Sequence, residues 1–553
     1  MYLVKNRLTR GKTAVTAAQA PGRRVLPLWW ETLDEDPLYL QRFDAEEILC
    51  GNVTLLHEDR KAAGEHSHLW NFNLHYLEYL IPLVAEYRRT GEERWYAGFK
   101  EACIGWIRDN RSGDGDGWHP YTISLRLTNL LICMDGLGEI LEQDGEFVRE
   151  LSGSMYAQYL HLQRNLERHL LANHYFENLK AVLLGSLYFR EENTYSKYRA
   201  LLRREIAAQI LPDGVHYERS LMYHKIILED LMRVAGALSG IDDDFGRELL
   251  EPIQRMADAM CVLEEGAGRT PLFNDAGDNV ARSMESLLNG LREQLRIVPT
   301  HPAKRAFPDA GYYCLTGDGI KILMDAGEIA PTFAAGHGHC DALSFELFIQ
   351  GQPVFVNSGT GLYQGALRPY FRSTAAHNTV VIDGQEQSEC WGEHRVARRI
   401  FNVSGSCGKG WIEGALTTCT GKRQERRIEL GGRTIRILDT VKGRAQAYLH
   451  LAPEWEYIQQ GRKILLRKRP GMAVVSETSE KSKAAASACP GGSAALQGII
   501  TVRGDEVLRI HREGNLALYA PEFGQMVKIQ TLEIFWMGDG TAHEIEIEFQ
   551  KQE

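Results

Sequence analysis

Apolar residues recur at helical spacing through the first half of the chain, from about Asn71 to Arg296. Short glycine-containing breaks, at residues 111–117 and 211–214, separate these apolar stripes. The pattern predicts antiparallel helical hairpins, which pack as a bundle, a solenoid or a closed toroid. Periodicity alone does not choose among the three. The clearest stripes are Tyr76, Leu80, Leu83, Val84 and Tyr87; Leu127, Leu130, Leu131, Met134 and Leu141; and Ile227, Leu228, Leu231, Ala235 and Leu238.

Near residue 300 the periodicity changes from helical to alternating. Residues 297–311 include three prolines, and the chain beyond them has the pattern of strands separated by glycine-rich turns. This pattern predicts an antiparallel β-sandwich. We expect an N-terminal extension (1–65), a helical domain (66–300) and a β-sandwich domain (301–553) with a low-complexity loop at 479–493. The clearest predicted strands are 319–325, 342–351, 433–441, 506–512 and 543–549.

The composition is that of a folded protein with an acidic balance. Of its 553 residues 44% are hydrophobic, and the formal net charge is −10. A general nucleic-acid binder is usually basic, so we expect no nucleic-acid partner. A local basic cleft can still hold an anionic substrate. The sequence contains no run of 18 apolar residues, so no membrane span is expected, and nothing in it predicts an oligomeric state.

Two further features bear on the compartment. The first 24 residues carry six basic side chains but lack the continuous apolar core of a signal peptide. The ten cysteines include no C-x-x-C pair, and they fit free thiols in a reducing compartment. We therefore expect a cytoplasmic protein, with a periplasmic or secreted location left open.

Two polar clusters stand beside helical stripes. Asn173 and His174 precede a strongly apolar segment, where Asn173 could simply cap the helix and His174 lie at the surface. A second cluster crowds polar and aromatic residues into nine positions after the turn at 211–214. Turns carry functional residues often, although the tyrosines could instead pack at the helix entrance. The second cluster is His216, Tyr217, Glu218, Tyr223 and His224.

A third cluster opens the predicted β-sandwich. His337 and His339 flank one glycine, so on an extended chain both imidazoles point to the same side. Such a pair can serve one metal or one substrate, although a lone H-x-H segment can also be a polar turn. The functional interpretation gains weight from the polar residues that follow within about forty positions: Asp341, Asn357, Arg372, His377 and Asn378.

Six segments resemble, in order, the motifs of the heparinase II/III-like polysaccharide lyase family within the alginate-lyase-like superfamily. They are residues 69–77, 121–131, 173–178, 213–224, 336–347 (GHGHCDALSFEL) and 371–385 (FRSTAAHNTVVIDGQ). The resemblance implies an α+β multidomain fold, an incomplete (α/α) toroid followed by an antiparallel β-sandwich. It also implies a lyase that cleaves a uronic-acid-containing polysaccharide or oligosaccharide by β-elimination. Heparan sulfate, hyaluronan, alginate and bacterial capsular polymers all stay open as substrates.

The resemblance also assigns roles to residues. It implies that Asn173 neutralises the uronate carboxylate with His174 beside it, and that Tyr223 acts as acid and, for some substrates, as base. His337 is implied as a second base or a carboxylate contact. The residues expected to bind substrate are Arg126, Asn129, Tyr217 and Arg372.

The resemblance implies no required cofactor, but some family members hold a structural metal with histidine, aspartate and histidine. His339, Asn357 and His377 fall at those positions, so zinc or another divalent metal would be held with an amide as the middle ligand. A neutral amide oxygen is a weaker ligand than a carboxylate, which weakens the metal prediction.

Two other functions fit the same residues. A glycoside hydrolase on a helical toroid would need two carboxylates about 5–10 Å apart, and Glu177, Asp213 and Glu218 are candidates. A non-catalytic glycan-binding or assembly protein would also retain the fold, and Asn357 gives that interpretation some support.

Overall fold

The computed structural model describes residues 22–30, 47–50, 53–56, 68–110, 113, 115–278, 280–300, 305–469, 497–504, 506–536 and 542–550. The expected loop at 479–493 and most of the expected N-terminal extension lie outside these residues. The chain divides into two compact units, of which the first is Met1–Gln209, Ile227–Ile253 and Glu285–Val298. The second is Ile210–Ile226, Gln254–Met284 and Pro299–Glu553.

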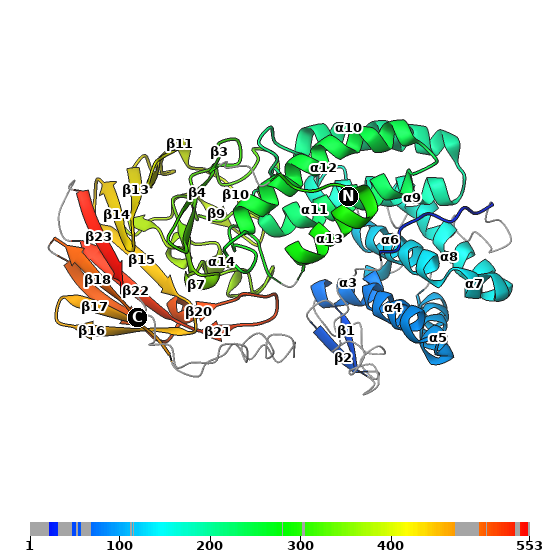
Figure 1. Cartoon of the computed structure of the whole chain (residues 1–553), viewed down its shortest axis with the longest axis horizontal. Helices are drawn as coiled ribbons and strands as arrows, with labels where there is room; N and C mark the ends of the chain where they lie inside the picture. The colour runs from blue at the N-terminus through cyan, green and yellow to red at the C-terminus, as the bar shows by residue number, and fades with distance from the viewer. Residues whose placement is uncertain are drawn as a thin grey trace. The chain divides into compact units, whose positions relative to one another are not determined.

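The first unit is helical, and its elements are coloured blue to green in Figure 1. The observed helices confirm the predicted helical pattern between residues 71 and 296. A short antiparallel pair, β1 (Glu47–Cys50) and β2 (Val53–Leu56), precedes them. The helices are α3 (His68–Tyr76), α4 (Ile81–Thr90), α5 (Glu93–Asp109), α6 (Pro120–Leu137), α7 (Glu139–Gln143), α8 (Gly145–Arg164), α9 (Ala172–Tyr188) and α10 (Glu192–Gln209), with parts of α11 (Leu221–Ala237), α12 (Asp243–Glu264) and α13 (Met284–Leu295).

Helix α9 forms the centre of this unit. All of its side chains except that of His174 are buried, as expected of a helix surrounded by other helices. It packs against α6, α8 and α10. At Gly185 an added Cβ would lie 2.6 Å from the ring of Tyr159, so glycine permits the close approach of α8. Lys180 is buried within the unit and forms ion pairs with Glu177 and Asp230.

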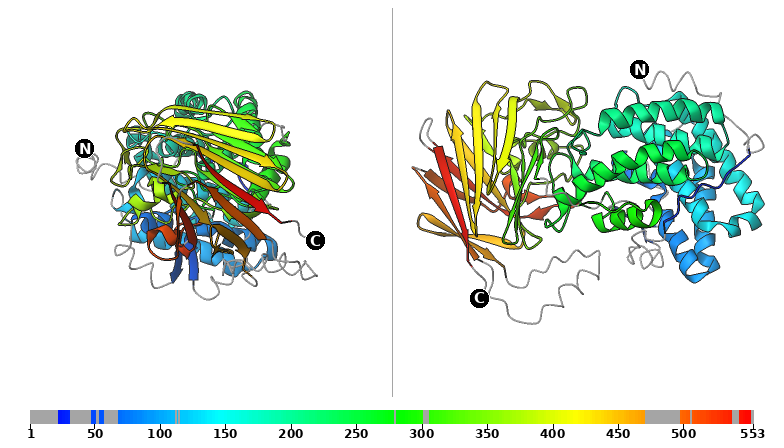
Figure 2. Two further views of the ribbon diagram at one scale, coloured as in Figure 1. Left: turned by 90° about the vertical axis from the view of Figure 1, so that its left-hand side faces the viewer. Right: turned by 45° about the horizontal axis from the view of Figure 1, so that its top comes forward.

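The second unit contains two large antiparallel sheets, drawn from green to red in Figures 1 and 2. In the first sheet the strand order is β11 (Phe401–Gly408), β12 (Trp411–Thr417), β13 (Arg423–Gly431), β14 (Thr434–Val441), β23 (Ala542–Phe549), β18 (Gln497–Arg503), β17 (Lys463–Lys468) and β16 (Trp455–Gln460). In the second it is β19 (Glu506–His511), β22 (Gln530–Trp536), β15 (Ala445–Leu451), β7 (Gln352–Phe355), β6 (Phe345–Ile349), β5 (Ile320–Asp325), β4 (Tyr312–Gly317) and β3 (Ala306–Phe307), with β8 (Val380–Ile382) paired to β15.

Burial along the strands shows how the two sheets pack. Strands β14 and β23 alternate between buried and more exposed residues, so one face of their sheet is buried. Apolar side chains of both sheets meet in one core cluster, which defines a β-sandwich. Strands β5, β6, β14, β19 and β23 confirm the strands predicted from alternation.

Strand β5 is buried on both faces, and this explains why two segments from the helical half pack with the sheets. Ile320, Ile322 and Met324 belong to the sandwich core. Leu323 belongs to a second apolar cluster that includes Val215 and Leu263. Residues 210–226 and 254–284 thus cover the outer face of this sheet. Their helical periodicity did not reveal which unit they join.

Arg426 and Asp439 form a buried ion pair inside the sandwich. Both Arg426 Nε and Nη2 donate to the Asp439 carboxylate at 2.8 Å, and Nη1 donates to the backbone oxygen of Leu343 at 2.7 Å. Neither side chain exceeds 1% exposure. The pair therefore ties β13 and β14 to the segment that precedes β6.

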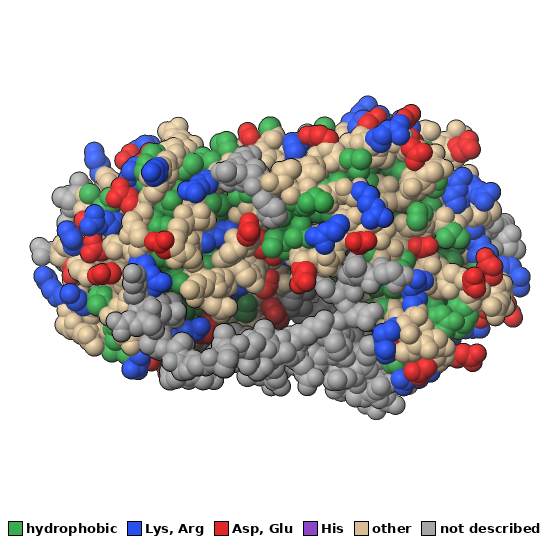
Figure 3. Space-filling model, viewed as in Figure 1, with side chains coloured by type: hydrophobic (Ala, Val, Ile, Leu, Met, Phe, Trp, Pro, Cys, Tyr) green, Lys and Arg blue, Asp and Glu red, His purple; other side chains and the backbone are tan. Residues whose placement is uncertain are grey.

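The face of the molecule drawn in Figure 3 is mixed in charge. Basic and acidic side chains are both scattered over this face. Within the described part of the chain, no helix is both long and apolar enough to cross a membrane.

We expect Arg426→Met to lower the free energy of unfolding of the second unit by about 3–5 kcal/mol, because it leaves the Asp439 carboxylate buried without its partner. Urea unfolding followed by tryptophan fluorescence measures this change. The matched control is Arg436→Met, which removes a half-exposed pair with Glu546 on the same sheet and should change the midpoint little. Equal losses in the two variants would contradict the special role of the buried pair.

Candidate active site

Asp275 is a fully buried carboxylate in the segment between α12 and α13. It contacts His337 Nδ1 at 2.9 Å and His339 Nε2 at 2.8 Å. Arg368 donates to it through both terminal nitrogens, with Nη2 at 2.7 Å. Burial alone would raise the pKa of Asp275, but Arg368 and the two histidines hold it well below its usual range. Asp275 is therefore a charged anchor shared by two imidazoles.

The backbone around Asp275 is fixed against the loop that carries both histidines. The N–H of Asp275 donates to the His337 carbonyl, and the N–H of His339 donates to Asn274 Oδ1, each at 3.0 Å. The N–H of Asn274 donates to Asp341 Oδ2 at 2.8 Å. Asn274 adopts a left-handed φ of 57°, which asparagine tolerates better than most residues. These bonds explain how both imidazoles of the H-x-H segment reach one carboxylate.

Tyr223 lies in the first turn of α11, beside His337. Their ring centroids are 4.4 Å apart. Ser220 Oγ accepts the N–H of Tyr223 at 3.4 Å and donates to the Asp275 carbonyl at 2.7 Å, so the helix start is tied to the anchor segment. The Tyr223 hydroxyl lies 2.6 Å from that of Tyr363. The structure thus brings together two of the predicted catalytic residues, Tyr223 and His337.

His337 lies between two carboxylates. Its Nδ1 contacts Asp275, and its Nε2 lies 3.6 Å from Glu218 Oε1. Burial lowers the pKa of His337, but Glu218 and Asp275 outweigh that effect and raise it above the usual value. The His337 side chain keeps 18% exposure, whereas Glu218 is almost fully buried. His337 therefore combines partial access to solvent with a pKa raised by its two acidic neighbours.

Other members of the cluster at 213–224 point into the protein. His224 Nε2 donates to the Met256 carbonyl at 2.9 Å and its Nδ1 accepts the N–H of His216 at 3.2 Å. Burial lowers the pKa of His224 to about 4, so it is neutral at physiological pH. Tyr217 is 5% exposed and packs against the exposed ring of Phe333, with 5.6 Å between centroids. Substrate binding by Tyr217 stays a prediction.

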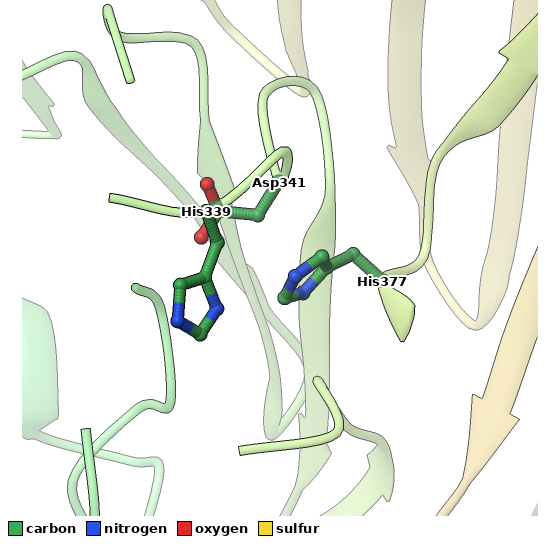
Figure 4. Close-up of side chains that lie close together, drawn as sticks. All are labelled: His339, Asp341 and His377. Carbon is green, nitrogen blue, oxygen red and sulfur yellow. The ribbon is translucent and has the colours of Figure 1, made fainter. Parts of the chain in front are cut away.

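Three buried side chains could hold a metal ion. His339, Asp341 and His377 each offer a ligand atom, and these atoms lie within 4.8 Å of one another. Figure 4 shows the imidazole of His377 pointing toward that of His339. His339 Nδ1, His377 Nε2 and Asp341 Oδ1 are buried without a hydrogen-bond partner among the described residues. Two imidazoles and one carboxylate are a donor set that suits zinc, so the residues fit the group.

Asn357, the expected middle ligand, has a different environment. Its Oδ1 lies 3.3 Å from His377 Nδ1, so it can accept the proton of that nitrogen and orient the ring. Asp341 supplies a carboxylate that the resemblance had not assigned to the metal. Metal binding by Asn357 itself stays a prediction.

Asn173 and His174 lie in the helical unit, at the start of α9. Leu171, with a φ of 59°, occupies the N-cap position, and Asn173 is 1% exposed, so the alternative that Asn173 caps this helix is wrong. His174 Nδ1 lies 3.1 Å from Glu167 Oε1, and its ring centroid lies 4.2 Å from that of Tyr121. Their catalytic roles stay predictions.

The structure gives two predicted substrate-binding arginines internal roles. Arg126 is fully buried and donates to Gln158 and to the carbonyls of His75 and Gly117. Its guanidinium also lies 3.9 Å from the Trp106 ring. These contacts do not support the prediction that Arg126 contacts substrate.

Arg372 is 1% exposed, and its guanidinium donates hydrogen bonds to the backbone carbonyls of Gly338, Glu393 and Arg395. It braces the loop of His337 and His339 rather than facing solvent. Asn129 is half-buried and donates to the Tyr76 carbonyl at 3.1 Å. Its substrate contact stays a prediction.

Asp275, Arg368 and Tyr363 belong to the site but were not predicted from the sequence. Asp275 lies in a turn-like segment, FNDAG, that has no periodic or motif signal. Arg368 precedes Pro369 in the four-residue helix α14 (Arg368–Phe371) and was close to the noted segment 371–385. A search for charged residues flanking that segment would have found Arg368.

Two models of one protein family match this chain, which has a helical unit and an antiparallel sandwich. The heparinase II/III N-terminus model matches residues 52–303, and the heparinase II/III-like C-terminal model matches residues 299–540. The chain belongs to the heparinase II/III-like family.

The curated relatives share less than a quarter of the aligned residues with this chain. A heparin-sulfate lyase of Pedobacter heparinus is 22% identical over 349 residues, which cover 57% of this chain and 52% of that protein. A heparin-sulfate lyase of Bacteroides stercoris is 23% identical over 374 residues, with 57% and 54% covered. The chain thus spans about half the length of these relatives.

A crystal structure of heparinase III matches with a TM-score of 0.67 at 16% identity, covering 87% of this chain and 77% of that one. The likeness confirms the expected fold, a helical toroid followed by an antiparallel β-sandwich.

We expect Glu218→Gln to lower the pKa of His337, because the neutral amide removes a charge that stabilises the imidazolium. The neutral ring reacts with diethyl pyrocarbonate, so the pH at which His337 becomes reactive should fall. Peptide mass spectrometry over a pH series measures that midpoint. His169, an exposed histidine of the helical unit, serves as the internal reference. An unchanged midpoint for His337 in Glu218→Gln would contradict the ion pair.

Proposed function

We propose that the protein is a polysaccharide lyase that cleaves a uronic-acid-containing polysaccharide by β-elimination. The observation that carries the proposal is the pairing of Tyr223 and His337 over the buried Asp275. The family membership and the fold support it.

β-Elimination needs two kinds of help. The C5 proton of a uronate is weakly acidic, so the carboxylate must be neutralised while negative charge develops beside it. A base must take the proton and an acid must protonate the leaving oxygen. His337 lies between two carboxylates that raise its pKa, so its protonated form is stabilised and can contact a uronate carboxylate. Tyr223, whose hydroxyl can both donate and accept a proton, is then the acid–base residue.

Tyr363 contributes to that chemistry through its hydroxyl. A hydrogen bond from Tyr363 Oη to Tyr223 Oη, at 2.6 Å, would stabilise a tyrosinate at Tyr223. Desolvation and the nearby Asp275 raise the pKa of Tyr363 well above its usual value, so Tyr363 keeps its proton and can donate it. The roles of Asn173 and His174 as carboxylate neutralisers rest on the resemblance alone.

The hydrolase alternative is weakened by the state of the carboxylates that it would use. Glu177 is buried and paired with Lys180. Asp213 accepts the backbone N–H groups of Val215 and Ala310, so it is committed to the local fold. Glu218 is almost fully buried, and a hydrolase needs a second carboxylate facing the same sugar.

The substrate we propose is an anionic polysaccharide or oligosaccharide that contains uronate. Three relatives are named heparin-sulfate lyases, and an alginate lyase of Stenotrophomonas maltophilia is 24% identical over 233 residues. Uronate is the chemistry that these names share. A cytoplasmic location stays a prediction.

We also propose that His339, Asp341 and His377 hold a divalent metal, with zinc as the best match to the donors. His339 would bind through Nδ1, because its Nε2 contacts Asp275. His339, Asp341 and His377 would hold the metal, which would brace the histidine loop against the segment of His377, and the elimination would use Tyr223 and His337.

A screen of uronate-containing polysaccharides tests the lyase proposal. The wild-type protein should produce a rise in ultraviolet absorbance, because elimination leaves a C4–C5 double bond. Heparan sulfate, hyaluronan, alginate and capsular polymers form the panel. Hydrolysis products without this absorbance, or silence across the panel from folded protein, would overturn the proposal.

Tyr223→Phe should lower kcat by about 10²–10⁴-fold, because it removes the acid–base hydroxyl and keeps the ring. Substrate affinity should change little. Tyr313→Phe is the matched control, since Tyr313 hydrogen-bonds the Gly405 carbonyl and should keep full activity. Equal activity of wild type and Tyr223→Phe would remove Tyr223 from the mechanism.

Elemental analysis of the purified protein, after zinc loading and desalting, tests the metal proposal. About one equivalent is expected for wild type and much less for Asp341→Asn, which loses the carboxylate charge. His511→Ala, at a histidine paired with Glu533, should keep the metal. Full metal content in Asp341→Asn, or none in wild type, would contradict the proposed ligands.

A further inference from the structure

Two cysteines lie side by side next to the candidate active site. The Sγ atoms of Cys340 and Cys390 are 3.6 Å apart, although 50 positions separate them in the chain. Both are free thiols, as are Cys103, Cys133, Cys261, Cys314, Cys407 and Cys419. Cys340 is buried and Cys390 is partly exposed. Solvent-borne reagents therefore reach the pair through Cys390.

The two cysteines belong to segments that converge on the same arginines. Cys340 follows His339 directly, and its N–H donates to the Arg372 carbonyl at 3.0 Å. Cys390 begins the hairpin of β9 (Cys390–Trp391) and β10 (Arg395–Val396). Within that hairpin the Glu393 carbonyl accepts hydrogen bonds from Arg368 and Arg372. A bond between the cysteines would close a covalent link around these arginines.

A disulfide between Cys340 and Cys390 requires only a small movement of the two sulfur atoms. A disulfide needs an S–S distance of about 2.05 Å, so the two Sγ atoms must approach each other by roughly 1.5 Å. Side-chain rotation can provide such a shift. The thiol of Cys340 also lies 3.3 Å from the Ser388 carbonyl, a weak contact that this rotation gives up.

The chemistry favours attack by Cys390. The thiolate is the nucleophile in exchange reactions. Cys390 is partly exposed and Cys340 is buried, so Cys390 is the thiol that a dissolved oxidant reaches first.

We propose that Cys340 and Cys390 form a reversible disulfide when the protein meets a low-molecular-weight disulfide such as glutathione disulfide. The Cys390 thiolate attacks one sulfur of the oxidant, forms a mixed disulfide and releases one thiolate. The Cys340 thiol then loses its proton and attacks Cys390 Sγ, which releases the second thiolate. The protein loses two protons and two electrons, and the oxidant is reduced to two thiols.

The bond would fix the β9–β10 hairpin to the histidine loop. Arg368 and Arg372 take part of their backbone acceptors from that hairpin, so oxidation would restrict the segment that supports the anchor Asp275. This site is independent of the proposed lyase activity, because its formation is read as a covalent bond.

Mass spectrometry of the full-length protein tests the proposal. The protein is incubated with glutathione disulfide, the remaining thiols are blocked with N-ethylmaleimide, and the digest is searched for linked peptides. The expected result is a Cys340–Cys390 peptide, two fewer blocked thiols than in the untreated protein, and full reversal by dithiothreitol. A lasting glutathione adduct on Cys390, a link to other cysteines, or no loss of thiols would overturn it.

Two variants test whether the disulfide depends on Cys390. Cys390→Ser should abolish the link and leave Cys340 as a buried thiol. Cys407→Ser, at a similarly half-buried cysteine on β11, should form the link as wild type does. Hydrogen exchange in the hairpin should slow on oxidation of wild type and of Cys407→Ser but not of Cys390→Ser, and unchanged exchange in oxidised wild type would show that the bond does not fix the hairpin.

Discussion

In the second unit, the arrangement of the candidate active site relies on the buried negative charge of Asp275. An isolated carboxylate in the position of Asp275 would be strongly unfavourable, because burial removes its hydration. Arg368, His337 and His339 offset that cost by bonding to the same two oxygens. Since each partner faces the same carboxylate, a shift of any one changes the environment of the others. The positions of both histidines are therefore consequences of where one aspartate is buried.

The helical unit contains a similar arrangement. Glu167 is buried, and His174 and Asn178 contact its two oxygens. Burial would raise the pKa of Glu167, yet these neighbours and His119 bring it below the usual value. In both units a histidine singled out by family resemblance is oriented by an acidic residue that the sequence did not single out. A fixed ring nitrogen is what imidazole chemistry requires.

Much of the fold could be predicted from periodicity, because helical and alternating patterns report directly on which faces are buried. The strand β14 and the stripe around Leu127 are examples. Side chains whose role depends on long-range contacts could not be predicted so well. Arg126 has the charge of a substrate-binding residue, but its acceptors are carbonyls of distant segments. Asp275 follows no period, and only the folded chain brings it to His337, 62 positions away.

The discontinuous second unit limits how this architecture can be divided or exchanged. A recombination point near residue 300 separates the sequence where its periodicity changes, yet it would leave Tyr223, Glu218 and Asp275 on the wrong fragment. The sandwich fragment would then carry Arg368 and two histidines without their shared counter-charge, and its β5 face would be bare. The sequence after residue 300 therefore lacks part of the packing and the counter-charge that its own sheets and histidines use.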